Sequence, residues 1–276
     1  MILIDMSQIL FASASMSMKS GKADINIIRH MTLNSLKKYR KEYFDEYGEL
    51  VICCDGKHSW RREFFPQYKA ARKSGRETSS VDWSEVFEIF NQLKNEIKEN
   101  FPYRVIHVDT AEADDIIGTL VLRGREEGEK TLIISSDKDF IQLQMNDNVY
   151  QYSPITKKFL NGVDPNEYLK EHILRGDKGD GIPNVLSDDN VIVDRIRQTP
   201  ITKKNLEVWM EGSLPKEHAE RHERNTELID LRYTPWHLQN TILKQKEQKP
   251  VGNRNKLPAY FKEHKLEVLS THIRDF

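Results

Sequence analysis

Short apolar runs alternate with longer mixed segments through the first half of the chain. Four runs of four or five residues, each bounded by polar or turn residues, have the length and composition of buried strands. They are residues 1–4, 50–54, 104–108 and 131–134, with 149–152 as a weaker fifth. The segments between them, at 24–47, 83–101 and 111–123, are long enough for helices. This alternation predicts an α/β fold with a mostly parallel central sheet and helices on both faces.

The second half of the chain has a different pattern. After about residue 160 no strand-like run occurs, and helical segments are interrupted by Pro and Gly. We therefore expect an α/β core at 1–160 and a helical lobe at 161–276, which can share one hydrophobic core. The stripe Val86, Phe87, Phe90 and Leu93 is expected to be helix core. Trp83 and Trp236 are expected to anchor packing rather than to stack on bases.

Composition favours a soluble protein of a reducing compartment. No apolar run approaches the roughly 18 residues that span a bilayer, and no basic leader or cleavage site opens the chain. The only two cysteines, Cys53 and Cys54, are neighbours in an apolar run, which supports neither a disulfide framework nor a zinc site. We expect a cytoplasmic location and no membrane partner.

Charges are segregated along the chain although the formal net charge is only -1. Between Lys57 and Arg76 seven basic residues accompany a single acid, Glu63, and aromatic side chains lie among them. Basic segments with interleaved aromatics are typical of proteins that bind polyanions. A solvated helical face has the same pattern, so the charge run alone does not decide between the two interpretations.

Acidic residues gather at the expected ends of the strands. Asp5 and Asp55 follow the first two strands, the fourth strand leads into Asp137 and Asp139, and segment 112–115 opens a predicted helix after the third. Carboxyl ends of parallel strands share one edge of a sheet, where open α/β sheets place their sites. The candidate set at this edge is Asp5, Asp55, Glu112, Asp114, Asp115, Asp137 and Asp139.

Several carboxylates close together need a cation to neutralise their charge. One acid at the start of a helix is usually a cap, but several acids close together take up protons unless cations neutralise them. No Lys or Arg matches them in the same turns, so the pattern indicates bound divalent metal. Oxygen ligands favour Mg²⁺, with Mn²⁺ as a substitute, over zinc. Two such ions would support phosphodiester hydrolysis, and the basic stretch would hold the polyanionic substrate.

A glycine-rich segment at 176–184 adds two more acids, Asp177 and Asp180. Their spacing of three fits one face of a turn, and the glycines allow backbone amides to approach a phosphate. An ordinary loop is equally consistent with this composition. The segment is not a Walker A loop, because no Gly-Lys-Ser/Thr follows it.

Six motifs in one order resemble the 5′ nuclease, or flap endonuclease, superfamily, and especially its RNase H group from T-even-type bacteriophages. They are LIDMSQ at 3–8, CDGK at 54–57, WRREFFPQYKAAR at 60–72, EADD at 112–115, SSDKDF at 135–140 and GDKGD at 176–180. Each motif is weak alone, but six in family order are specific. The resemblance implies a PIN-like 5′ nuclease core, an arch or bridge region at about 57–82, and a helix-turn-helix-like duplex-binding element at about 174–198.

The resemblance also implies roles for individual residues. It assigns a first metal to Asp5, Asp55, Asp114 and Asp137. It assigns a second metal to Asp139, Asp177 and Asp180, with Glu112 and Asp115 acting directly or through water. Lys69, Arg72 and Asp137 are the expected catalytic residues, with Lys69 and Arg72 on one helix face reaching the scissile phosphate. The expected DNA contacts are Lys57, Arg61, Arg62, Tyr68, Lys69, Arg72, Lys178, Gly179 and Gly181.

Enzymes of this kind remove RNA primers and short 5′ flaps from lagging-strand fragments by 5′ to 3′ exonuclease and flap endonuclease action. The implied substrates are RNA–DNA hybrids and flapped or nicked duplex DNA, and a phage protein would act in the host cytoplasm. Residues 186–190 depart from the family's Gly-Ile-Gly-Lys pattern, which leaves a monovalent-cation site open. The terminal Phe276 is a candidate docking point for a sliding clamp or single-strand-binding protein, with a frayed tail as the alternative. We expect a monomer.

Two other functions stay open at this point. A PIN-type endoribonuclease would explain the carboxylates, but not Asp177, Asp180 or the helical lobe. A non-catalytic protein that binds DNA structures is disfavoured, because every acidic position that the chemistry needs is present.

Overall fold

The computed structural model describes residues 1–19, 22–77, 79–145 and 147–276. Across these residues a six-stranded sheet forms in the order β3-β2-β1-β4-β5-β6. The strands are β1 (Ile2–Asp5), β2 (Leu50–Cys54), β3 (Arg104–His107), β4 (Thr131–Ile134), β5 (Val149–Ser153) and β6 (Lys158–Phe159). All pairings are parallel except the antiparallel β5–β6 pair. The mostly parallel sheet predicted from the sequence is confirmed, and β6 is an addition to it.

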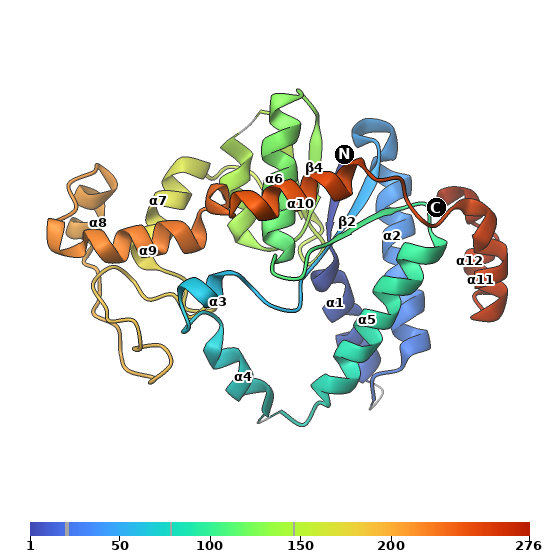
Figure 1. Cartoon of the computed structure of the whole chain (residues 1–276), viewed down its shortest axis with the longest axis horizontal. Coiled ribbons are helices and arrows are strands. Elements are labelled where there is room, and N and C mark those ends of the chain that lie inside the picture. The colour runs from blue at the N-terminus through green and yellow to red at the C-terminus, as the bar shows by residue number, and fades with distance from the viewer. Residues whose placement is uncertain (20–21, 78, 146) are drawn as a thin grey trace.

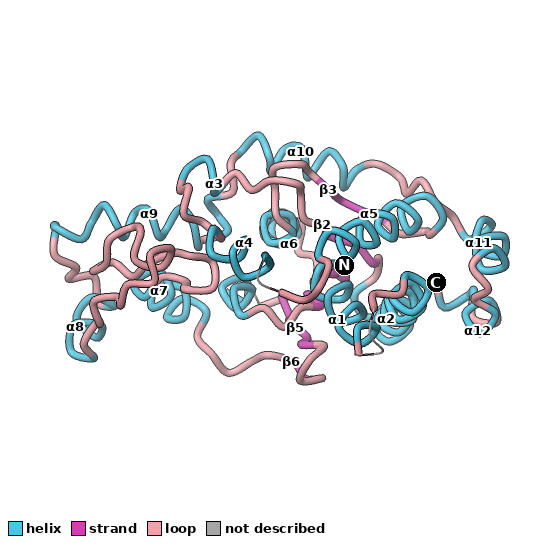
Figure 2. The backbone as a smooth tube through the Cα atoms, turned by 90° about the horizontal axis from the view of Figure 1, so that it is seen from below, coloured by secondary structure: helices cyan, strands magenta, loops and turns pink. Residues whose placement is uncertain are grey.

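Helices cover both faces of the sheet. Figure 2 shows the strands between α6 and α10 on one side and α1, α2 and α5 on the other. These helices are α1 (Met6–Met18), α2 (Ile25–Tyr47), α5 (Trp83–Asn100), α6 (Ala113–Glu126) and α10 (Trp236–Glu247). Helix α1 was not predicted from the sequence, because its small and apolar residues carry no charged face that would mark a helical period. Asp5 starts α1 as its N-cap and accepts a hydrogen bond from the Gln8 amide.

Strand residues alternate strictly between two hydrophobic clusters. Ile2 and Ile4 pack with α1, α2 and α5, whereas Leu3 between them packs with α6 and α10. Strand β2 repeats this division, since Ile52 faces the first cluster and Val51 the second. A sheet covered on both faces needs apolar residues at every position, which explains the uninterrupted apolar runs in the sequence.

The remaining helices lie at the two ends of the molecule, except for two short ones, α3 and α4, that lie between one end and α5 (Figure 1). They are α3 (Arg61–Phe64), α4 (Ala70–Glu77), α7 (Pro165–Arg175), α8 (Lys203–Met210), α9 (Ala219–Ile229), α11 (Leu257–Glu263) and α12 (Glu267–Ser270). The 3₁₀ helices are η1 (Lys138–Met145), η2 (Lys216–His218), η3 (Leu231–Tyr233), η4 (Arg254–Lys256) and η5 (Ile273–Asp275). None of the helices within the described ranges is long and apolar enough to cross a membrane.

The prediction of a helix-turn-helix-like element at about 174–198 is wrong for the backbone. Helix α7 ends at Arg175, and the described residues 176–202 form turns and irregular chain before α8 begins. Side chains hold these turns: the Asn184 amide donates to the Thr199 carbonyl, and the Ser187 hydroxyl accepts from the Thr199 amide. Asn, Ser and Asp side chains that bond to the backbone compete with helix formation, and this segment is rich in them.

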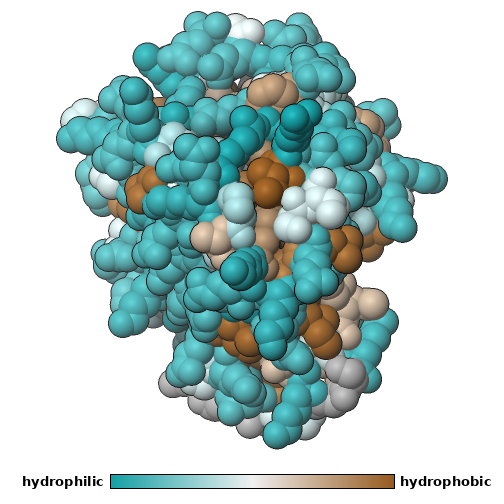
Figure 3. Space-filling view, turned by 90° about the vertical axis from the view of Figure 1, so that its right-hand side faces the viewer, coloured by the Kyte–Doolittle hydropathy of each residue, from teal (hydrophilic) through white to brown (hydrophobic). Residues whose placement is uncertain are grey.

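The C-terminal region packs back onto the sheet domain. Tyr260, Phe261 and Phe276 surround Phe101 at the end of α5, with ring centroids 5.2 to 6.0 Å from it. Phe276 is fully buried, so the expectation that its ring docks a replication partner is wrong for this structure. The face that carries α11 and α12 is largely hydrophilic, with its apolar side chains set among polar ones (Figure 3).

The two tryptophans singled out from the sequence have different environments. Trp83 is half-buried and lies beside Phe11 and Phe87, as expected for a packing residue. Trp236 opens α10 and is 77% exposed, so its expected role in packing is wrong.

Candidate active site at the carboxyl ends of the strands

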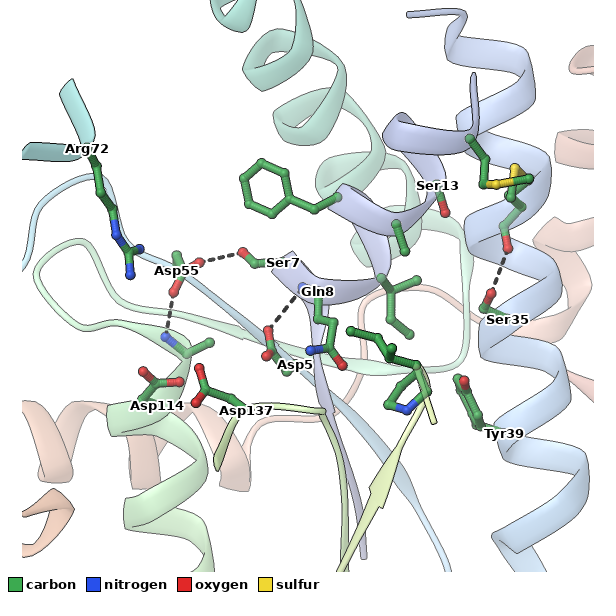
Figure 4. Close-up of a pocket in the computed structure, with 18 of the residues that line it drawn as sticks. Asp5, Ser7, Gln8, Ser13, Ser35, Tyr39, Asp55, Arg72, Asp114 and Asp137 are labelled. Carbon is green, nitrogen blue, oxygen red and sulfur yellow. Dashed lines mark hydrogen bonds between the residues drawn. The ribbon is translucent and has the colours of Figure 1, made fainter. Parts of the chain in front are cut away.

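Four carboxylates meet where the central strands end. Asp5 ends β1, Asp55 and Asp137 follow the neighbouring strands β2 and β4, and Asp114 lies in the first turn of α6. All four line one cavity of about 690 Å³. Figure 4 shows them gathered near the start of α1, with Arg72 extending towards Asp55 from α4. The expectation that parallel strands bring these acids to one edge is therefore met.

Hydrogen bonds from the chain fix the orientation of these carboxylates. Asp5 accepts the Gln8 amide at 3.2 Å and the Ser135 hydroxyl at 2.9 Å. Asp55 accepts the Ala113 amide at 2.8 Å and also the Ser7 hydroxyl. The supporting serines were not identified from the sequence, because a hydroxyl acquires this role only through its tertiary neighbours.

The carboxylates are crowded enough to disfavour their own ionisation. Burial, and then the charge of Asp55, raise the pKa of Asp5 to about 7. Burial also raises the pKa of Asp114 well above its usual range, and nearby Asp137 and Glu112 add to the effect against the opposing charge of Lys69. A divalent cation would remove this repulsion, so the donor set of Asp5, Asp55, Asp114 and Asp137 fits a metal ion with oxygen ligands.

In EDTA, Asp5→Asn should stabilise the protein at pH 8. The folded-state pKa of Asp5 is raised to about 7 from 3.8, so the stability it contributes is present below pH 4 and lost as pH rises towards 7. Asn carries no charge and keeps an oxygen for the Gln8 amide, so we expect a gain of roughly 2–3 kcal/mol at pH 8. Urea denaturation of both proteins between pH 4 and pH 8 measures this difference in the free energy of unfolding. A gain in stability from Asn that is the same at every pH would contradict the raised pKa of Asp5.

A second acidic group lies beside the first and contains a histidine. His172, in the last turn of α7, has Nδ1 3.5 Å from Asp139 Oδ1 and Nε2 3.3 Å from Asp177 Oδ2. One nitrogen of His172 and one oxygen from each carboxylate lie within 4.8 Å of one another, so the three side chains could hold one metal ion. The two acids were predicted from the sequence, but His172 was not, because a single histidine in a polar helix forms no sequence pattern.

Charge and burial oppose each other in this group. Burial raises the pKa of Asp139 to about 7, and the nearby Asp137 adds to the rise. Burial alone would lower the pKa of His172, but Asp177 and Asp139 raise it. The pKa of Asp177 is lowered despite its burial, because nearby His172 and the Asp180 amide, which donates to it, favour its charged form.

Lys69 and Arg72 border the same cavity from segment 67–72. Lys69 Nζ lies 2.6 Å from Glu112 Oε1 and 3.4 Å from Asp180 Oδ2, and Arg72 pairs with Asp180. Against the effect of burial, Lys69 and Arg61 lower the pKa of Glu112 to about 2. The expectation that Lys69 and Arg72 share one helix face is wrong, because Lys69 has φ 53 and precedes α4.

Two expected functional residues form a buried ion pair instead. Arg61 is 2% exposed and Asp115 is fully buried. Arg61 Nη1 donates to Asp115 Oδ2 at 3.0 Å, and its Nη2 lies 2.9 Å from Asp115 Oδ1. Trp60 and Thr234 also donate to Asp115. Arg61 is therefore not available as a DNA contact. The oxygens of Asp115 already accept hydrogen bonds from these three side chains, so Asp115 has a structural role next to the site.

The other expected DNA contacts divide by exposure. Tyr68 is buried, and its hydroxyl lies 2.7 Å from Glu112 Oε2 and 2.9 Å from Asp180 Oδ2, so its ring is not free to stack on a base. Lys57 and Arg62 are exposed and line a second cavity of about 780 Å³. This cavity shares Asp55, Lys69 and Arg72 with the first and adds further basic side chains, Arg76 and Lys94. Lys178 and Gly179 are exposed on the turn after α7.

Glycines shape the turn that carries Asp177 and Asp180. Gly176 ends α7 with φ +67, and a Cβ there would lie 2.4 Å from the carbonyl oxygens of Ile182 and Pro183. Gly181, with φ +78, would place a Cβ 2.7 Å from the Gln67 carbonyl oxygen. Gly181 therefore serves the packing of the 176–181 turn against segment 67–72, where the Lys69 amide donates to the Asp180 carbonyl at 2.6 Å.

Gly176→Ala should lower the free energy of unfolding more than Gly162→Ala does. Both residues have positive φ, at +67 and +82, but a Cβ on Gly162 would meet nothing within 4 Å. The Gly162 variant should cost about 1 kcal/mol from backbone strain alone, and the Gly176 variant about 2 kcal/mol more from the added clash. Urea denaturation of the two variants measures the difference. Equal losses would mean that the 182–183 carbonyls move away at no cost.

Comparisons with known proteins show which family the chain resembles. The family model of the 5′-3′ exonuclease N-terminal resolvase-like domain matches residues 1–173, and that of the T4 RNase H C-terminal domain matches residues 165–276. The ribonuclease H of Enterobacteria phage T4 is 33% identical over 289 residues, which cover 99% of this chain and 95% of that protein. Flap endonuclease Xni of Shewanella sp. (strain MR-4) is 32% identical over 49% of this chain and 52% of its own length.

Solved structures share the fold. A crystal structure of the bacteriophage T5 flap endonuclease, in a complex with DNA and metal ions, has a TM-score of 0.64 at 19% identity and covers 90% of this chain and 99% of that one. The resemblance inferred from the six motifs is thus confirmed over almost the whole chain. On the match to residues 1–173 and the nearly full-length similarity to the phage T4 enzyme, this chain belongs to the 5′-3′ exonuclease family, a family of nucleases within the 5′ nuclease superfamily.

Proposed function

We propose that this nuclease is a divalent-metal-dependent 5′ to 3′ exonuclease and flap endonuclease with RNase H activity. The observation that carries the proposal is the convergence of Asp5, Asp55, Asp114 and Asp137 on one cavity that Lys69 and Arg72 also line. Clustered carboxylates beside two cations suit the hydrolysis of a phosphodiester, because the substrate brings negative charge and needs both metal and cationic partners. The relatives named ribonuclease H, flap endonuclease and 5′-3′ exonuclease support the same chemistry.

Two groups of side chains would hold the metal ions. Asp5, Asp55, Asp114 and Asp137 form the first group, and Asp139, Asp177 and Asp180 the second. Mg²⁺ is the ion that oxygen ligands favour, with Mn²⁺ as a substitute. When bound, these ions would supply Lewis-acid activation for phosphodiester hydrolysis. The raised pKa values of Asp5 and Asp139, both to about 7, support the need for such cations.

Basic side chains of the chain would bind and orient the substrate. Lys69 and Arg72 now pair with Glu112 and Asp180, and a phosphate in the cavity would compete for the same positive groups. Lys57 and Arg62 line the adjoining cavity and would hold the nucleic-acid backbone without reading its sequence. The arch region at about 57–82 and the turns at 176–184, with Lys178 and Gly179, are the proposed contacts to flap and duplex.

The proposed substrates are RNA–DNA hybrids and flapped or nicked duplex DNA. A monomer in the cytoplasm, a monovalent cation near the 176–184 turn, and contacts with a single-strand-binding protein or sliding clamp also remain proposals. A route for such contacts through Phe276 is not among them, because that ring is buried.

Cleavage of a 5′-labelled RNA–DNA primer on a nicked template tests the function. We expect short 5′-labelled products with Mg²⁺ and none with EDTA. Tight binding without turnover in either Mg²⁺ or Mn²⁺ would identify a binding protein instead. Faster cleavage of free single-stranded RNA than of the nicked or flapped duplex would favour a PIN-type endoribonuclease.

A further inference from the structure

The second acidic group differs chemically from the first. The four carboxylates of the first group offer only oxygen as metal donors, whereas in the second group the imidazole of His172 lies between Asp139 and Asp177. A nitrogen donor at this position is not part of the ligand set inferred from the sequence. It changes which ions the group can hold.

The surrounding structure holds the His172 ring in place. Its side chain is only 12% exposed, and Nδ1 is buried with no hydrogen-bond partner among the described residues. The Tyr168 ring packs against it, with centroids 5.6 Å apart. Helix α7 is itself fixed at its start by Asp164, which accepts the amides of Asn166 and Glu167. The imidazole is thus a preoriented donor rather than a mobile surface group.

The distances between His172 and its two carboxylates are those of ligands sharing an ion. A charged nitrogen that donates directly to a carboxylate usually lies about 2.7–2.9 Å from it. The observed separations, 3.3 Å to Asp177 and 3.5 Å to Asp139, are longer. Two donors that each lie about 2.1 Å from one ion are about 3.0–3.5 Å apart in octahedral to tetrahedral geometry.

We propose that His172 binds the second metal through one imidazole nitrogen, beside Asp139 and Asp177, so that this site prefers a first-row transition ion such as Mn²⁺ or Co²⁺ to Mg²⁺. Imidazole suits transition ions, while Mg²⁺ strongly prefers oxygen ligands and keeps much of its water. The first site, built from oxygen donors, retains its preference for Mg²⁺. This inference rests on the proposed function, since it assigns a ligand to the second metal of that same site.

Metal binding without substrate tests the inference directly. The full chain is titrated with Co²⁺ in excess Mg²⁺, followed by calorimetry and by the visible absorption of bound Co²⁺. His172→Gln should weaken Co²⁺ binding at one site by at least about tenfold, the loss that even outer-shell changes cause, and should alter its absorption. Mg²⁺ affinity, measured alone, should change by less than about twofold. His222→Gln, at a half-buried histidine of α9 that lines neither cavity, is the matched control and should change nothing.

Other results would overturn this inference or, separately, the proposed function. Unchanged Co²⁺ affinity and absorption in His172→Gln would overturn the inference, and tighter binding would show that the ring blocks the ion rather than binding it. If the variant does not fold, ¹⁵N-histidine NMR of the wild-type protein with Zn²⁺ decides, because a bound imidazole nitrogen shifts strongly and no such shift would overturn the assignment. Wild-type protein that fails to cleave nucleic acid in Mg²⁺ would instead contradict the proposed function, whatever the Co²⁺ titration shows.

Discussion

Asp137→Asn should abolish most cleavage while leaving nucleic-acid binding intact. Asp137 follows β4, is exposed to the cavity, and lies among the carboxylates of the first proposed metal site. Its Oδ1 accepts the Asp139 amide at 3.1 Å, and Asn keeps an oxygen for that bond, so the turn should hold its shape. The variant loses charge at the point where the transition state needs a bound cation. We expect a loss of at least roughly 10²–10³-fold in kcat.

The measurement pairs a rate with an affinity. Single-turnover cleavage of a flapped duplex gives the rate, and binding of the same duplex in Ca²⁺ gives the affinity, which should stay within about threefold of wild type because the basic side chains are unchanged. Asp45→Asn, at an exposed position on α2 that lines neither cavity, removes the same charge and should retain full activity. Comparable rates for Asp137→Asn and Asp45→Asn would refute the proposed catalytic centre.

Arg61→Met should destabilise the fold far more than Arg62→Met. Arg61 is 2% exposed, pairs with Asp115 and donates from Nε to the Leu228 carbonyl at 2.8 Å. Its removal leaves the fully buried carboxylate of Asp115 without its cation, which typically costs about 3–5 kcal/mol. Arg62, its neighbour in sequence, is exposed, so its replacement should change stability by less than about 0.5 kcal/mol.

Denaturation and DNA binding separate the two arginines. Urea denaturation should show a much lower midpoint for Arg61→Met with an unchanged slope, and Arg62→Met should instead weaken DNA binding and its salt dependence. The double variant Arg61→Met with Asp115→Leu should recover part of the lost stability, because an apolar pair can replace a buried ion pair. No recovery would mean that the Leu228 and Glu112 contacts of Arg61, rather than its pairing with Asp115, carry the stabilisation.

The buried Arg61–Asp115 pair also shows where sequence patterns stop being sufficient. Asp114 and Asp115 are adjacent acids in the same motif, yet one lines the cavity and the other is fully buried. Successive helix residues point about 100° apart, so only one of two neighbours can face the site. Which one does so depends on how α6 lies on the sheet. Arg61 and Arg62 divide in the same way, one turned to the core and one to solvent.

Patterns that depend on chain direction and burial were accessible from the sequence. Continuous apolar runs predicted the strands, because a sheet covered on both faces buries every residue. Acids directly after those runs predicted the shared edge, because parallel strands all end on the same side. The positions of Asp5, Asp55 and Asp137 follow from these two rules alone.

Contacts between distant segments were decided only by the tertiary structure. His172 meets Asp139 because α7 packs on η1, the turn after α7 docks against segment 67–72, and Phe276 is buried because α11 and α12 return to Phe101. Local sequence determines which residues end a strand or cap a helix, since backbone geometry and hydrogen bonding act over a few residues. Which side chains then meet depends on how helices pack against the sheet, where the contribution of each residue depends on neighbours far along the chain.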